Sequence, residues 1–139
     1  MEIIANALQT VAANQNVYFT DTITGGSMSI SHRSNSGLVN LFGNTNQCRA
    51  RFKVTFGANI AIPEGETVGP VTLAIAIDGE AVQSTTMIVT PTAVETFFNV
   101  FSAIFIDVPR GNIETVSVKN IGTIPVDVEN ANLIIERVA

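Results

Sequence analysis

Apolar and polar residues alternate with a period of two along much of this chain. In the clearest run, 48–57, every second residue is apolar and the residues between them are basic or polar. The apolar positions are Cys48, Ala50, Phe52, Val54 and Phe56. Successive side chains of a β-strand point to opposite faces of its sheet, so this alternation predicts a strand with one buried and one exposed face.

Turn-forming sequences separate the alternating runs and divide the chain into ten or eleven candidate strands. The turns are Gly25-Gly26, Pro63-Glu64-Gly65, Asp78-Gly79, Pro109-Arg110-Gly111-Asn112 and Asn120-Ile121-Gly122. The candidate strands are 3–10, 16–23, 27–32, 37–42, 48–57, 70–78, 81–90, 94–108, 113–119, 124–129 and 131–138. So many short strands in 139 residues predict one all-β domain, 1–139, built as an antiparallel sandwich.

The segment 94–108 is apolar on both faces if it forms a strand. A helix is the alternative, since Phe98, Phe101 and Phe105 could share one helical face, but the Val, Thr, Ile and Phe content favours a strand. We expect one side to face the core, with Val94, Phe98, Val100, Ile104, Ile106 and Val108. The other side then carries Phe97, Phe101, Ala103 and Phe105.

This second apolar side needs a cover, for which two alternatives remain open. The chain's own amino-terminal segment could lie over it, or a neighbouring subunit could bury it. Charged residues make up only 14% of the chain, fewer than a monomer surface ordinarily carries, and this favours the subunit. We therefore predict an oligomer interface at Phe97, Phe101 and Phe105.

Composition and charge narrow the classes of partner. A net charge of −5 without a basic run argues against nucleic acid, because neutralising phosphates needs clustered Lys and Arg. No apolar run approaches the roughly 20 residues that span a bilayer, so no membrane partner is expected. The start of the chain, Met1-Glu2-Ile3-Ile4, lacks the features of a secretion signal.

The residues that usually support catalysis are scarce. There is one His, His32, and one Cys, Cys48, which excludes an internal disulfide. A transition-metal site needs three or four converging ligands, so we interpret His32 as structural. We interpret Cys48 as a buried, inert apolar residue. No catalytic residue, cofactor or metal is predicted, and the chain is not expected to be an enzyme.

Three acidic pairs and one basic ladder complete the candidate chemistry. The acidic pairs are Glu64/Glu66, Asp78/Glu80 and Asp127/Glu129, which we interpret as solvated turns because Ca²⁺ needs six to eight oxygen ligands. Arg49, Arg51 and Lys53 project from one face of a single strand. They are candidate polar contacts, either across a subunit boundary with Glu95, Asp107 or Glu114 or with an acidic capsid surface.

The whole chain resembles the tumour necrosis factor-like and complement-like jelly-roll head domain. The matching patterns are Gly37-Leu38-Val39-Asn40-Leu41, the strand from Cys48 to Phe56, the run from Leu73 to Glu80, the aromatic strand 97–105 and the closing run from Ala131 to Arg137. Such domains occur in bacterial exosporium-type glycoproteins and in small phage virion proteins. The resemblance implies a tumour necrosis factor-like sandwich of about ten strands and a compact homotrimer.

Bacterial members of this group usually carry a collagen-like Gly-X-Y stalk, and this chain has none. The resemblance therefore favours a phage virion subunit of the capsid decoration or head-fibre type. It would be made in the host cytoplasm and would bind the major capsid protein. The alternative is the receptor- or glycan-binding head of a fibre or cell-surface adhesin.

Overall fold

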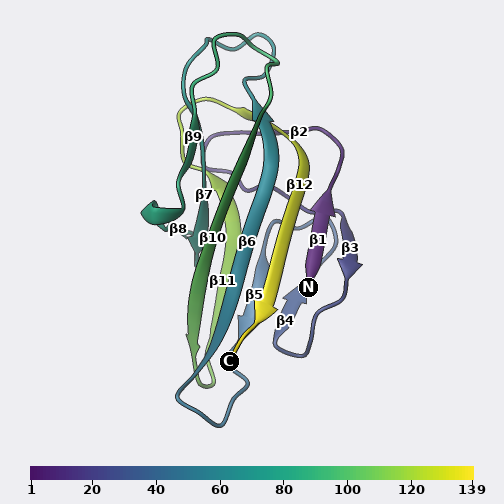
Figure 1. The fold of residues 1–139 in the computed structure, drawn as a ribbon, viewed down its shortest axis with the longest axis vertical. Coiled ribbons are helices and arrows are strands. Elements are labelled where there is room, and N and C mark those ends of the chain that lie inside the picture. Colours follow the sequence, from purple (N-terminus) through teal and green to yellow (C-terminus); the bar gives the residue numbers. More distant parts are fainter.

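A computed structural model describes all residues from Met1 to Ala139 and shows twelve β-strands and one short helix (Figure 1). The strands are β1 (Glu2–Ala5), β2 (Gln9–Val11), β3 (Asp21–Thr24), β4 (Ile30–His32), β5 (Val39–Phe42), β6 (Arg49–Ala61), β7 (Val71–Ile77), β8 (Glu80–Ala81), β9 (Met87–Val89), β10 (Phe98–Pro109), β11 (Ile113–Asn120) and β12 (Val126–Arg137). The helix is η1 (Gln83–Thr85), a single 3₁₀ turn. No helix in the structure has the length and apolar character that crossing a membrane requires.

The strands form two six-stranded antiparallel sheets. The first sheet, sheet A, has the order β10-β6-β12-β1-β3, with β2 also paired to β12. The second sheet, sheet B, has the order β4-β5-β11-β7-β8, with β9 also paired to β7. The all-β class and the antiparallel sandwich predicted from the alternating pattern are confirmed, and so is the jelly roll that the family resemblance implies.

The longest ladder joins β6 to β10 and extends from the pair Phe98–Ile60 to the pair Pro109–Arg49. Because β10 has no second neighbour in sheet A, it forms one edge of that sheet. The segment 94–108 therefore contains a strand, as predicted, and not the alternative helix. The strand begins at Phe98, four residues later than expected.

Four predicted strands are divided or merged in the structure. The run 3–10 forms two short strands, β1 and β2, and η1 divides 81–90 into β8 and β9. In contrast, 124–129 and 131–138 belong to one strand, β12, with a bulge between Glu129 and Asn132. Asn130 lies in this bulge with φ +55°, a left-handed conformation that Asn adopts more readily than most residues.

One core lies between the sheets and contains 29 buried apolar residues. The inward positions of β6 supply Phe52 and Phe56, which are both fully buried. Phe19 packs edge-to-face on Phe56, with ring centroids 6.4 Å apart. The core uses only one side of β6 and β10, so the other side of sheet A remains on the surface.

Candidate self-association surface

The outer side of β10 presents two large aromatic side chains to solvent. Phe101 is 65% exposed and Phe105 is 61% exposed, while Val100, Ile106 and Val108 on the opposite side are buried. Residues four apart on a strand share a face and lie about 13 Å apart. The chain's own amino-terminal segment therefore does not cover these rings, and that alternative is wrong.

Neighbouring strands extend this surface across sheet A. Ala103 lies between the two rings and pairs with Thr55 of β6, which in turn pairs with Ile134 of β12. Ile134 is only half-buried. We call Phe101, Ala103, Phe105 and Ile134 the aromatic band. An apolar strip on an edge strand is an unusual feature of an isolated soluble domain, because it favours pairing with another chain.

The other two predicted aromatic residues lie at the start of β10. Phe97 precedes the strand and is 37% exposed. Phe98 pairs with Ile60 and is 42% exposed, so its predicted place in the core is wrong. Phe98 is the first residue of β10 and lies at the end of the ladder. Val100 and Ile106, further along the same strand, are buried.

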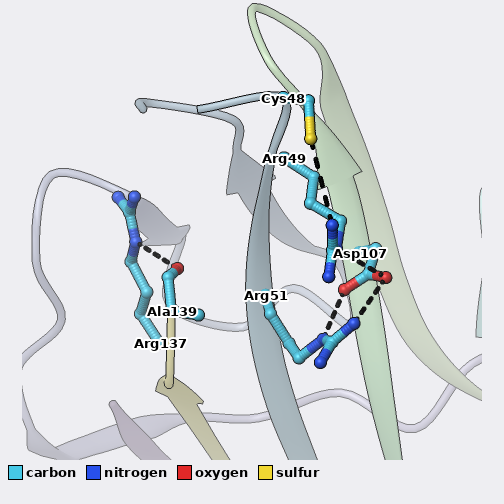
Figure 2. Close-up of polar contacts among 6 residues, drawn as sticks. All are labelled: Cys48, Arg49, Arg51, Asp107, Arg137 and Ala139. Carbon is cyan, nitrogen blue, oxygen red and sulfur yellow. Dashed lines mark hydrogen bonds and ion pairs between the residues drawn. The ribbon is translucent and has the colours of Figure 1, made fainter. Parts of the chain in front are cut away.

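The basic ladder lies on the same side of sheet A as the aromatic band. Arg49 Nε lies 3.1 Å from Asp107 Oδ2, and Arg51 donates from Nε to Oδ1 at 2.8 Å and from Nη2 to Oδ2 at 3.1 Å (Figure 2). The hydrogen bond from Arg51 lowers the pKa of the Asp107 carboxyl below its ordinary value of 3.8. Asp107 is one of the three carboxylates that the sequence offers as partners across a subunit boundary, but both arginines bind the Asp107 of their own chain.

Lys53 is the third member of the ladder and lies beside the aromatic band. It pairs in the register with Phe105 on one side and with Glu136 on the other. The structure contains only two ion pairs, both on Asp107, so the Lys53 ammonium has no carboxylate within 4.0 Å. The ladder therefore keeps positive charge next to exposed aromatic rings.

The two residues considered for metal or thiol chemistry lie in different settings. Cys48 is exposed, not buried as predicted, because it precedes the first residue of β6. His32 lies in β4, where Nε2 is 2.9 Å from the carbonyl oxygen of Ser36 and the ring packs edge-on against Phe19. His32 Nδ1 is buried and has no hydrogen-bond partner. No three His, Cys, Asp or Glu side chains lie close enough to hold a metal ion.

The acidic residues pair differently from their spacing in the sequence. Asp127 is 3% exposed, so it does not lie in a solvated turn, and it accepts a 2.6 Å hydrogen bond from Thr10. Desolvation and a hydrogen bond with Asp127 raise the pKa of Glu95. A hydrogen bond with Asp78 likewise raises the pKa of Glu114 and lowers that of Asp78.

An asparagine ladder that sequence analysis missed crosses the outer side of sheet A. Asn99 Nδ2 donates to Asn59 Oδ1 at 3.1 Å, and Asn59 Nδ2 donates to Asn130 Oδ1 at 3.1 Å. The three residues come from β10, β6 and the bulge of β12, so only the strand register brings them together. The aromatic band thus lies between the asparagines and the basic ladder.

Comparison with known proteins supports the fold. No protein-family profile and no curated protein matches the chain. Among solved structures, the globular domain of zebrafish complement 1qA protein overlays with a TM-score of 0.70 and 11% identity, over 99% of this chain and 95% of that chain. The chain therefore has the complement-like, tumour necrosis factor-like jelly-roll fold.

Two sugar-binding structures overlay much less well. A family 35 carbohydrate-binding module from Clostridium thermocellum gives a TM-score of 0.36 at 14% identity, over 92% of this chain and 98% of that chain. The sugar-binding C-terminal domain of EclA gives a TM-score of 0.37 at 13% identity, over 83% and 89%. Overlays this loose transfer no ligand to the present chain.

Proposed function

We propose that this chain is a non-enzymatic structural subunit of a virion, of the capsid decoration or head-fibre type, which assembles as a homotrimer through the aromatic band. The observation that carries the proposal is the exposure of Phe101 and Phe105 on an edge strand beside the basic ladder. The jelly-roll fold is compatible with such an assembly, and the resemblance of the sequence to small phage virion proteins supports the virion location.

The energetics of the aromatic band favour burial between subunits. Fully burying one exposed Phe side chain contributes about 1.5–3 kcal/mol. Phe101 and Phe105 are 65% and 61% exposed, so burying the remainder of both rings offers about 2–4 kcal/mol per subunit before association costs are subtracted. Closure around a threefold axis would cover the free edge of β10 in every copy. Phe97 at the start of β10 extends the predicted interface.

The trimer is tested with a matched pair of variants. Phe101→Asp places a carboxylate in the proposed interface and should give a monomer in sedimentation equilibrium at micromolar concentration, whereas the wild-type chain should give a trimer. Ile88→Asp is the control, since Ile88 is equally exposed, at 62%, but lies on β9 of sheet B. A monomeric wild-type chain, or a trimeric Phe101→Asp variant, contradicts the proposed interface.

The virion role is tested on particles assembled with and without the protein and imaged by electron cryomicroscopy. Loss of ordered threefold knobs from the capsid surface is the expected result and would support binding to the major capsid protein. Unchanged capsids combined with failed attachment to host cells would contradict this role and favour the receptor- or glycan-binding alternative.

A further inference from the structure

Charges on sheet A are separated along its long axis. Five of the seven basic residues of the chain lie at the end where β6 begins. They are Arg49, Arg51, Lys53, Arg110 and Arg137. The first three belong to β6. Arg110 lies beside them because its backbone N donates to Cys48 O, and Arg137 because it pairs with Phe52. We call this the basic end. Sheet A places the carboxylates of Asp107 and Glu136 there, and the oxygen of Ala139 accepts a hydrogen bond from Arg137 Nε at 3.1 Å (Figure 2).

The opposite end of sheet A carries acidic residues. They are Glu64, Glu66, Glu95, Asp127 and Glu129, and we call this the acidic end. The segments 59–67, 92–99 and 126–130 that build it contain no Lys or Arg. The two ends are the lower and upper ends of β6 in Figure 1, twelve residue steps or about 40 Å apart. That separation exceeds the Debye length of about 8 Å at physiological salt, so the ends do not neutralise each other.

The basic end has cationic donors without partners. Asp107 holds the guanidinium groups of both Arg49 and Arg51, so one carboxylate serves two positive charges. Neither Arg49 Nη atom donates a hydrogen bond to a carboxylate, and Nη1 lies 3.9 Å from Cys48 Sγ (Figure 2). Lys53 is a third cation beside these two arginines, and unlike them it forms no ion pair. Asp107 thereby fixes the orientation of the two guanidinium planes while leaving donors available for another anion.

The acidic end offers a fixed, protruding anion. Glu64 and Glu66 are exposed on either side of Gly65, whose φ of +88° forms a tight turn. Glu66 N donates to Pro63 O at 3.2 Å and Glu64 N donates to Glu95 Oε1 at 3.0 Å, which hold the turn in place. Neither Glu64 nor Glu66 forms an ion pair within its own chain.

We propose that copies of this chain associate end to end, with the basic end of one copy receiving the Glu64–Glu66 turn of the next. Charge complementarity between the two ends of the same molecule identifies a second copy as the occupant. Exposed ion pairs are individually weak, so this contact is reversible and sensitive to salt. It uses a surface separate from Phe101 and Phe105, and it stands whether or not the aromatic band forms a trimer.

The test uses charge reversal at each end. The first variant carries Arg49→Glu and Arg110→Glu, which lie at the basic end and outside the row of Lys53 and Phe105, and the second carries Glu64→Lys and Glu66→Lys. At low salt, about 0.01 M, the wild-type chain should sediment increasingly fast with concentration, and about 1 M salt should abolish this because the Debye length falls to about 3 Å. Each variant on its own should lose association at least about tenfold, and an equimolar mixture should recover it, because each reversed end then meets its complement.

Three results would overturn the proposal. The wild-type chain could show no salt-dependent association, or the mixture of two folded variants could fail to recover it. The wild-type chain could also fail to self-associate but bind polyglutamate, which would assign the basic end to a foreign acidic partner. Repeating the experiment in the Phe101→Asp background separates the two contacts: loss of the trimer with retained end-to-end association contradicts neither this proposal nor the assignment of the aromatic band.

Discussion

Asn120 provides the sharpest test of how the sandwich is held together, because its fully buried amide joins the end of β2 to the turn that leads into β12. Its Nδ2 donates to Val11 O and to Ile124 O, both at 3.0 Å, and its Oδ1 accepts from Gly122 N at 2.9 Å. The side chain is completely inaccessible to solvent. Asn120→Ala would therefore remove three hydrogen bonds and leave their backbone partners unpaired around a small void.

The magnitude follows from those unpaired groups. A buried polar group without a partner costs about 1–3 kcal/mol. Val11 O is buried and the groups of Gly122 and Ile124 are partly buried, so the free energy of unfolding should fall by about 3 kcal/mol. For a domain of this size the melting temperature should fall by about 10 °C. With a guanidinium m value of about 4 kcal/mol/M, the unfolding midpoint should fall by about 0.8 M.

Far-UV circular dichroism is the suitable probe, since the chain has no Trp and a single Tyr. Asn44→Ala is the matched control, because Asn44 is exposed and makes one hydrogen bond, from Nδ2 to Met28 O at 3.1 Å. The control should change the unfolding free energy by less than about 1 kcal/mol. Equal midpoints for the two variants at one protein concentration would refute the assignment of Asn120 as a buried connector.

Two further predictions concern pH. Arg51 lowers the pKa of Asp107, so the contribution of this carboxylate to stability is present above pH 3.8 and is lost as the pH falls below that value. Asp107→Asn should therefore reduce the fall of the melting temperature at acid pH. The pKa of Glu95 is raised by desolvation and by Asp127, so its contribution is present below pH 4.5 and is lost as the pH rises through the folded pKa. Glu95→Gln should therefore raise the melting temperature at pH 7, and an unchanged or lower value would contradict the carboxyl pairing.

The alternating pattern predicted the strands because side-chain period depends only on local geometry. Residues 48–57 alternate strictly between apolar and other side chains. In β6, which contains most of them, the apolar positions are buried: Ala50, Phe52, Val54 and Phe56. The same rule failed for Cys48, which continues the alternation one step before the strand begins. Periodicity predicts which residues share a side but does not fix where the sandwich ends.

The contacts of the surface depend on register, which the sequence does not display. Arg51 and Asp107 are 56 residues apart, and they meet because β6 and β10 pair with this particular offset. A shift of one strand by one residue would move its side chain to the inner side and separate the pair. Asp127 shows the same limitation, since it is buried by contacts with Thr10 and Glu95 from distant segments.

The position of the aromatic band between two polar ladders has a consequence for how an assembly could remain finite. A long apolar edge strand is a hazard, because it can pair with another chain in many registers. In the proposed trimer the asparagine ladder at one end of the band and Lys53 at the other would each need matching polar partners, so only one offset between subunits buries Phe101 and Phe105 without also burying unpaired polar groups. The rings would then supply the affinity and the flanking polar residues the register, while the exposed charges beyond them stay free to contact the next copy.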